Sequence, residues 1–255
     1  MFNSTSYASE IDLLRLQKAY PDSIQAVSED YILWSDGTIM QTRDGIANKT
    51  PQAKIDSPSL LDQVDEVLYS IGVPNNPDNY TPSSDPGRIR YEPFFRKMYG
   101  NSQEEVESKL VLIYWMPKIF GSNYPLLVTT VNNVDQKLTS ISNELEELVA
   151  KHPEYIPFLE QPGGTYKWRF IANTNRLSNH SFGMTIDINS TTSNYWQWDL
   201  EHAGKTITED APLIYCNNVP WEIIPIFEKH GFIWGGKWQH YDSMHFEYRP
   251  ELLVG

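Results

Sequence analysis

The sequence has little positive charge: 20 lysines and arginines stand against 33 aspartates and glutamates, a formal net charge of −13. Nucleic-acid binding depends on clustered Lys and Arg side chains that neutralise phosphates. The balance therefore argues against a nucleic-acid partner. It also excludes electrostatic attraction to anionic membranes or polymers. A substrate of that kind must be held by local contacts.

Cysteine is almost absent, since Cys216 is the only one. A single cysteine excludes an intramolecular disulfide and any zinc cluster built from several thiolates. Its surroundings, "LIYCNNVP", offer no histidine to activate it, so we expect a small packed thiol rather than a nucleophile. Any metal must be held by histidine and carboxylate side chains.

Long apolar runs are lacking too, and no stretch is long enough to span a bilayer. The N-terminal residues lack the basic start and the apolar run of a signal peptide. A glycine-rich phosphate loop is also missing, because "QPGGTY" is not followed by the Gly-Lys-Ser/Thr that such a loop needs. What remains is 255 residues with 40% hydrophobic content, enough for one or two folded domains.

The chain is predicted to have two parts. Residues 1–85 form an N-terminal accessory region, with a helix in "EIDLLRLQKAY" and a hairpin in "YILWSDGTIMQTRDG" that turns at Asp36-Gly37. A segment dense in Pro, Asn, Ser and Asp, "GVPNNPDNYTPSSDPGR", predicts a long irregular connection. Residues 86–255 then form the main domain.

This domain is predicted to be α+β. Buried strands are expected in "KLVLIYWMP" and "PLLVTTVNNV", followed by an amphipathic helix in "VDQKLTSISNELEELVAKH". A shorter helix is expected in "VPWEIIPIFEKHGF", with Pro225 in its first turn and Gly231 as its stop. Strands and helices of this kind pack as a small sheet with flanking helices.

The most informative stretch is "SNHSFGMTIDIN", residues 178–189. If "MTIDIN" is a strand, Asp187 points away from the face that carries Met184, Ile186 and Ile188. His180 lies just upstream, and Gly183 permits a backbone bend that returns the imidazole to the same face as Asp187. This is the arrangement of a pair of metal ligands.

A second cluster, "GFIWGGKWQHYDSMHFEYRP", ends in another alternating strand, where His245 and Glu247 share one face. Two histidines and one carboxylate are an established ligand set for a catalytic zinc, with a fourth position left for water. His180, Asp187 and His245 supply that set. A carboxylate outside the ligand set must still take a proton from water, and Asp242 is our candidate, with Glu247 as its competitor or as a partner of a ligand.

These two clusters carry a family resemblance. "SNHSFGMTIDIN" resembles the S-x-H-x-x-G-x-x-x-D pattern, and "GFIWGGKWQHYDSMHFE" the W-G-G…D-x-x-H-F pattern, of the zinc D-alanyl-D-alanine carboxypeptidase family, which includes VanY-like enzymes and phage endolysin peptidases. The resemblance implies a small central antiparallel sheet with flanking helices, one Zn²⁺ on His180, Asp187 and His245, and Asp242 as general base. It also implies a substrate-binding arginine upstream of the first histidine, for which we prefer Arg169, in an expected strand "YKWRFI", over Arg176.

The function so implied is zinc-dependent hydrolysis of peptide bonds in peptidoglycan stem peptides, with a D-alanyl-D-alanine carboxypeptidase as the first choice. An L,D-carboxypeptidase or an endopeptidase on the same polymer stays open. So does a binding module that keeps zinc without catalysis, as in hedgehog-type relatives of this fold. A carbohydrate-binding protein or glycosidase rests only on the aromatic residues, such as Trp196 and Trp198, and on the many carboxylates. The substrate implies a periplasmic or secreted protein.

Overall fold

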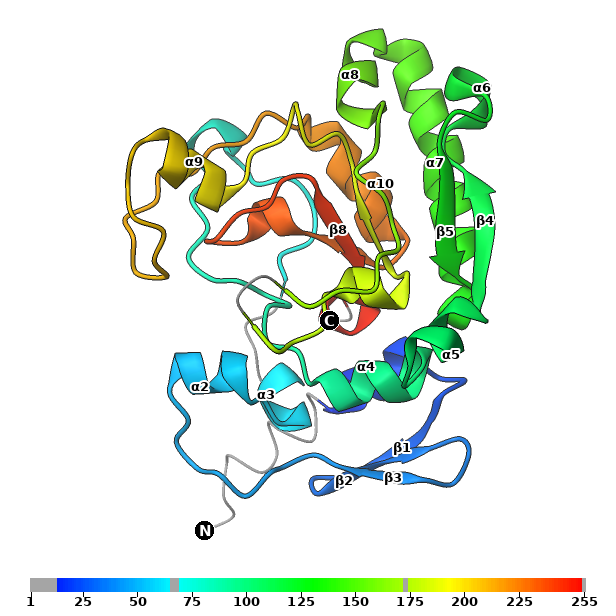
Figure 1. The fold of residues 1–255 in the computed structure, drawn as a ribbon, viewed down its shortest axis with the longest axis vertical. Coiled ribbons are helices and arrows are strands. Elements are labelled where there is room, and N and C mark those ends of the chain that lie inside the picture. The colour runs from blue at the N-terminus through cyan, green and yellow to red at the C-terminus, as the bar shows by residue number, and fades with distance from the viewer. Residues whose placement is uncertain (1–12, 65–68, 172–173, 254–255) are drawn as a thin grey trace. The chain divides into compact units, whose positions relative to one another are not determined.

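The computed structural model describes residues 13–64, 69–171 and 174–253 (Figure 1). The chain divides into two compact units. Unit 1 contains Met1–Ser70, Pro86–Met98 and Arg249–Gly255, and unit 2 contains Ile71–Asp85 and Tyr99–Tyr248. The architecture is α+β with small antiparallel sheets flanked by helices, as predicted. The predicted domain boundary at residue 85 stays a prediction. It concerns parts of the chain that fold as separate domains, whereas the two units are groups of residues in contact.

Unit 1 has a three-stranded antiparallel sheet of β1 (Ile24–Val27), β2 (Tyr31–Trp34) and β3 (Ile39–Gln41). The predicted hairpin is β2–β3, and Gly37 supplies the positive φ of +82° that its turn needs. Residues 13–19 are helical, within the predicted first helix. The other helices are α2 (Pro51–Asp56), α3 (Leu60–Val64), α4 (Glu92–Tyr99, whose last residue groups with unit 2) and the 3-10 helix η7 (Pro250–Leu252).

Unit 2 contains a two-stranded sheet of β4 (Leu110–Tyr114) and β5 (Pro125–Thr129), both of them predicted as strands from the sequence. The predicted burial of β4 is wrong, because none of its residues is buried and Leu112 is exposed. The long helix α7 (Val134–Lys151) contacts both strands through its apolar stripe, which includes Leu138, Ile141 and Leu145, all buried. Figure 1 shows α7 running alongside this sheet. The helix therefore packs on one face of this sheet, whereas Leu112 and Leu127, opposite each other in the register, are exposed.

A second sheet of unit 2 has the order β6–β8–β7, with β6 (Thr185–Asp187), β7 (Phe232–Trp234) and β8 (His245–Tyr248). Helix α10 (Ile224–Lys229) packs on it, with the ring of Phe227 stacked 3.7 Å from that of Phe246. Pro225 lies in the first turn of α10, where its missing N–H has no cost. The remaining elements of unit 2 are short: η1 (Pro77–Asn79), α5 (Gln103–Glu107), α6 (Pro117–Phe120), η2 (Val131–Asn133), η3 (Pro153–Tyr155), α8 (Ile156–Leu159), η4 (Asn179–Phe182), α9 (Trp196–His202), η5 (Trp221–Ile223) and η6 (Gly235–Lys237).

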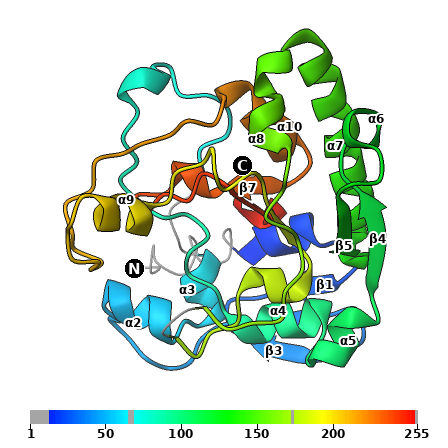
Figure 2. The same cartoon turned by 45° about the horizontal axis from the view of Figure 1, so that its top comes forward.

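Residues 71–85, which we call the strap, are irregular apart from η1, and all but Ile71 lie within the predicted irregular connection. The strap is nevertheless fastened to the rest of unit 2. At its start, Gly72 accepts a hydrogen bond from Lys237 and donates one to Glu228, and these two side chains form a buried ion pair. Further along, the ring of Tyr80 packs edge-on against a tyrosine and a tryptophan. In both ribbon views the strap loops out to a short helical turn and runs back (Figure 2).

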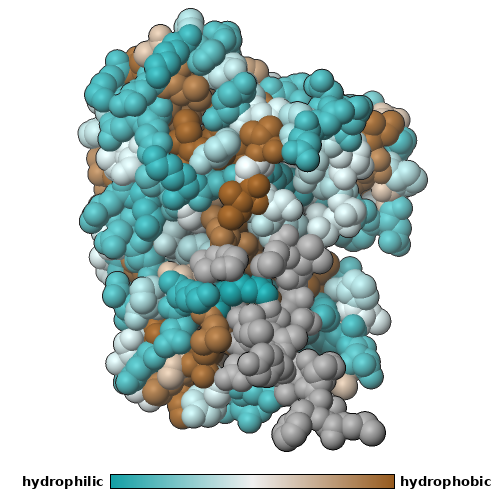
Figure 3. Space-filling model, turned by 180° about the vertical axis from the view of Figure 1, so that it is seen from behind, coloured by the Kyte–Doolittle hydropathy of each residue, from teal (hydrophilic) through white to brown (hydrophobic). Residues whose placement is uncertain are grey.

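Hydrophilic side chains cover most of the face in Figure 3, and hydrophobic ones show between them in patches. Among the described residues, no helix has both the length and the apolar character needed to cross a membrane. This agrees with the lack of long apolar runs in the sequence.

Candidate metal centre

Strand pairing brings together two of the predicted metal ligands. Strands β6 and β8 are antiparallel, and their register places Asp187 directly opposite His245 and Thr185 opposite Glu247. Side chains directly opposite each other on one face of an antiparallel pair are close neighbours. The alternation read from the sequence therefore predicts the face correctly for both strands.

The third predicted ligand is held by η4, just before β6. The Ser178 hydroxyl caps this 3-10 helix by accepting a hydrogen bond from the His180 N–H, and Gly183 ends it with a φ of +64°. A Cβ atom at Gly183 would lie 2.6 Å from Cδ2 of Leu110 and 3.2 Å from the backbone nitrogen of Thr129. Both the left-handed backbone and the close contact require glycine here, and the predicted bend is confirmed.

The three side chains converge. Nε2 of His180 lies 3.2 Å from Oδ2 of Asp187, and Nδ1 of His245 lies 2.9 Å from Oδ1 of the same carboxylate. One potential ligand atom from each residue lies within 4.8 Å of the other two. Both histidines are buried and Asp187 is partly buried. Asp187 and His180 lie 58 and 65 positions before His245 in the sequence, yet the three residues direct two nitrogens and an oxygen to one point.

The outer nitrogen of each imidazole has its own hydrogen-bond acceptor. Nδ1 of His180 lies 3.1 Å from the carbonyl oxygen of Thr165, and Nε2 of His245 lies 3.1 Å from Oε2 of Glu247. An acceptor on one ring nitrogen keeps the proton there and leaves the lone pair on the other. Glu247 is fully buried and also accepts a hydrogen bond of 2.8 Å from the Asn179 amide. It therefore orients a predicted ligand, one of the two roles that the sequence left open.

This donor set fits a zinc ion. Zinc prefers imidazole nitrogen and carboxylate oxygen in a set of three, with acceptors that orient the histidines from behind. The inner nitrogens of His180 and His245 both face Asp187, and their outer nitrogens are both hydrogen-bonded. Within the described residues no other group of three or more His, Cys, Asp or Glu side chains meets in this way.

The charges in the centre are strongly coupled. Burial by itself would lower the pKa of His245, but hydrogen bonds to Asp187 and Glu247 outweigh it and raise the pKa to about 10. Burial would raise the pKa of Asp187, yet the charges of both histidines and their hydrogen bonds hold it far below the usual range. Without a metal, the centre thus balances a negative carboxylate against an imidazolium.

Asp242, the predicted base, lies between η6 and β8, in the same unit. Its backbone forms an isolated bridge with Tyr195 and donates to the carbonyl of Gly235 at 3.0 Å. Burial, followed by the negative charge of Asp187, raises the pKa of the Asp242 carboxyl to about 7. Its Oδ1 is buried and makes no hydrogen bond to any described residue. A carboxyl group with such a pKa can exchange a proton near neutral pH.

The structure tests only the strand that was expected to carry Arg169. The expected strand "YKWRFI" is wrong: residues 166–171 are irregular, apart from an isolated bridge between Phe170 and Leu177. The backbone of Arg169 is instead tied to η4, because its N–H donates to the Ser181 hydroxyl at 3.0 Å. Its side chain is exposed, and its charge lowers the pKa of Asp242. Arg176 is partly buried, and a substrate role for either residue stays a prediction.

Some features of the centre were missed or misjudged. The carbonyl of Thr165 and the amide of Asn179 have no recognisable signal, because any residue has a carbonyl and the Asn179 contact spans 68 positions. His240 is buried, although a histidine in a polar turn favours the surface. The prediction of a packed thiol is wrong, since Cys216 is exposed.

Comparison with known proteins now adds to this geometry. Residues 172–248 match the D-alanyl-D-alanine carboxypeptidase family. This segment, 77 of the 255 residues, is similar to that family. The match contains all three converging side chains and Asp242, and it confirms the resemblance seen in the two sequence motifs. No curated protein and no solved structure matched the chain.

Proposed function

We propose that unit 2 is a zinc-dependent peptidase that hydrolyses peptide bonds in peptidoglycan stem peptides, in the first instance as a D-alanyl-D-alanine carboxypeptidase. The observation that carries the proposal is the meeting of His180, Asp187 and His245 inside the segment that matches a carboxypeptidase family. Such enzymes are typically metal-dependent. The substrate class implies a periplasmic or secreted protein, and we propose that location as well.

In this proposal His180 and His245 bind the ion through Nε2 and Nδ1, the nitrogens that face Asp187, which supplies the oxygen ligand. When bound there, zinc supplies Lewis-acid polarisation and lowers the pKa of water. Glu247 and the Thr165 carbonyl hold a proton on the outer nitrogen of each imidazole, so that the nitrogen facing Asp187 is the one that binds the ion. The chain thereby orients its ligands before the ion arrives.

Asp242 moves the proton. Attack of water on the scissile carbonyl releases a proton, which the Asp242 carboxylate accepts and then gives to the departing amine as the C–N bond breaks. The products are a free carboxylate and a free amine, so no further reactant is needed. Burial, the largest cause of the raised pKa of the Asp242 carboxyl, favours the protonated form that donates to the amine. Arg169 is proposed to bind a carboxylate or carbonyl of the peptide, because its exposed charge acts on Asp242.

The test is hydrolysis of defined muropeptides, with products identified by mass spectrometry. Cleavage of D-Ala-terminated peptides that is lost on dialysis against a chelator and restored by Zn²⁺ is the expected result. Release of a terminal D-Ala indicates the carboxypeptidase, whereas cut cross-bridges or L,D bonds indicate the alternatives. A zinc-loaded protein that binds wall fragments but cleaves none of them is a binding module, and the catalytic proposal is then wrong.

A further inference from the structure

The loop that carries Asp242 has a second set of polar contacts, outside the metal centre. We call residues 238–243, between η6 and β8, the base loop. Its C-terminal half is held by Asn194, which donates its N–H to the Ser243 hydroxyl at 2.7 Å and accepts the Ser243 N–H at 2.9 Å. Its N-terminal half depends on other partners, and His240 makes most of them.

His240 contacts two segments that are distant in the sequence. Its backbone N–H donates to Oδ1 of Asp85 at 2.8 Å, and its Nδ1 lies 2.7 Å from Oδ2 of the same carboxylate. On the other side of the ring, Nε2 lies 3.0 Å from the carbonyl oxygen of Glu209. The ring also meets the indole of Trp196 edge-on, with centroids 4.8 Å apart. One buried imidazole thus joins the end of the strap, the 209–215 segment and the base loop.

The partners define the state of this ring. A carbonyl oxygen can only accept, so the contact with Glu209 requires a proton on Nε2. The ionised carboxylate of Asp85 likewise accepts and requires a proton on Nδ1. Both bonds form together when His240 is an imidazolium, and charge-assisted bonds of this kind are about twice as strong as neutral ones. The carboxylate of Glu209, 3.6 Å from Nε2, adds to the same pairing.

The strap is fastened at both ends to the segment that leads to Asp242. Its start is bonded through Gly72 to Lys237, the last residue of η6. Its end is bonded through Ser84, whose carbonyl accepts the Gln239 N–H at 2.8 Å, and through Asp85 to His240. Residues 237–240 therefore have the strap as a fixed support, two residues before the proposed base.

We propose that Asp85 and His240 are positioning residues that hold the base loop so that the Asp242 carboxyl stays at the reaction centre. The inference rests on the proposed function, since it gives Asp242 the proton transfer. Removing the Asp85 carboxylate loosens the N-terminal half of the loop and leaves Nδ1 and the backbone N–H of the buried His240 without their acceptor. Displacement of a reacting group by about 1 Å can lower turnover by about a hundredfold. The role is thus in kcat rather than in the binding of metal or substrate.

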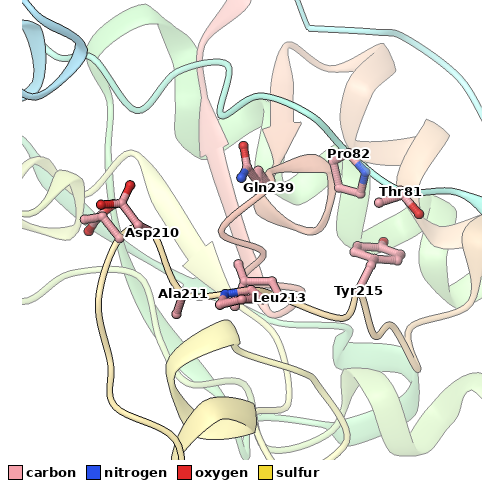
Figure 4. Close-up of a pocket in the computed structure, with 9 residues that line it drawn as sticks. Thr81, Pro82, Asp210, Ala211, Leu213, Tyr215 and Gln239 are labelled. Carbon is pink, nitrogen blue, oxygen red and sulfur yellow. The ribbon is translucent and has the colours of Figure 1, made fainter.

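A neighbouring cavity of about 370 Å³ offers a control (Figure 4). Gln239, Asp210 and Thr81 line it, and the close-up shows Gln239 among residues from the strap and the 209–215 segment. The Gln239 side chain is exposed, and the loop contact of this residue is through its backbone. Gln239→Ala therefore changes the cavity wall next to His240 without removing a contact that holds the loop.

The experiment compares Asp85→Ala, Asp85→Asn and Gln239→Ala in the full chain loaded with zinc, on a D-Ala-terminated peptide. Asp85→Ala is expected to lower kcat by about ten- to a hundredfold with KM and zinc content nearly unchanged. Asp85→Asn should recover most of kcat, because its amide oxygen accepts the His240 backbone N–H and its NH₂ can donate to Nδ1 of a neutral ring. Gln239→Ala should keep the wild-type kcat.

Hydrogen exchange of a peptide spanning residues 235–245 gives a readout without turnover. Exchange should be faster in Asp85→Ala than in the wild type, and close to wild type in Asp85→Asn. A wild-type kcat in Asp85→Ala, an equal loss in Asp85→Asn, or unchanged exchange in Asp85→Ala would each overturn the proposal. If Asp85→Ala does not fold, His240→Gln takes its place under the same criteria. An inactive wild type refutes the proposed function instead, and the exchange data still decide whether Asp85 holds the loop.

Discussion

At the scale of single residues, the proposed function gives the residues of the centre different roles: some bind the ion, and others orient those ligands or move the proton. His180, Asp187 and His245 meet at one point, whereas Glu247 lies behind His245 and Asp242 lies on the loop before it. Each role makes a different demand on the side chain. Substitutions at these positions should therefore differ in which measurement they change.

Asp242→Asn should retain zinc and lose turnover. The amide has nearly the shape of the carboxyl but cannot accept the proton, and general acid–base catalysis contributes about 10²–10⁴-fold. We expect kcat to fall within that range while the metal content, measured by mass spectrometry, stays at one ion per chain. A fully active variant would show that another group is the base.

Glu247→Gln should weaken zinc binding. The Glu247 carboxylate accepts from Nε2 of His245 and orients the ring so that Nδ1 faces Asp187, and removal of such a partner typically costs about 10–100-fold in metal affinity. Competition with a chromophoric chelator measures the change. Glu144→Gln is the matched control, because Glu144 pairs with His230 at 2.7 Å, outside the centre. Equal affinities for both variants would contradict the orienting role.

Zinc affinity should rise with pH through the neutral range. The pKa of His245 is raised to about 10 in the metal-free protein, so its ring is protonated at pH 7 and zinc must displace that proton from Nδ1. Because one proton leaves for each ion bound, the apparent affinity should increase by about tenfold per pH unit below the pKa. Titrations at about pH 6 and about pH 8 test this. A zinc affinity that is the same at both pH values would show that His245 carries no proton for zinc to displace.

At the scale of elements, the centre depends on how η4 meets the β4–β5 sheet. Gly183→Ala should destabilise unit 2, because the added Cβ meets Leu110 and the backbone of Thr129 and the residue must keep a left-handed φ. We expect a loss of about 1–3 kcal/mol in the free energy of unfolding. Gly204→Ala is the control, since its φ is +67° but no atom lies within 4 Å of its added Cβ. The thermal melting point should fall more for Gly183→Ala, and equal shifts would remove the steric argument.

The elements also show what could be read from the sequence. Alternation in "MTIDIN" and in the strand of His245 gives the faces of Asp187 and Glu247 correctly, because side chains of a strand alternate whatever surrounds it. It does not give the register that sets Asp187 opposite His245, nor the strap contact between Asp85 and His240, which lie 155 positions apart. The prediction of a strand at Arg169 is wrong for a related reason. The backbone of Arg169 forms hydrogen bonds with Ser178 and Ser181, which take the place of hydrogen bonds to a neighbouring strand.

At the scale of the whole molecule, the net charge of −13 bears on the choice of substrate. An acidic protein is repelled by an anionic polymer, and the repulsion is screened as the Debye length falls from about 30 Å at 0.01 M to about 8 Å at 0.15 M ionic strength. We expect kcat/KM on intact, anionic wall material to rise with salt over this range. For a short uncharged peptide amide, kcat/KM should show no such rise. An equal rise of kcat/KM on both substrates would show that salt acts on the enzyme and not on its repulsion from the polymer.

The pairing of Asp187 with His245 has one more consequence. These residues face each other across β6 and β8 but are 58 positions apart in the sequence, so an ion bound by both would link two distant segments of the chain. The unfolded chain does not bring these ligands together. A free ion concentration of about a hundred times the dissociation constant therefore adds about 2.7 kcal/mol to the free energy of unfolding. The zinc-loaded protein should therefore resist digestion by proteases for longer than the metal-free protein, and the ion proposed for the chemistry would also slow the degradation of the protein that holds it.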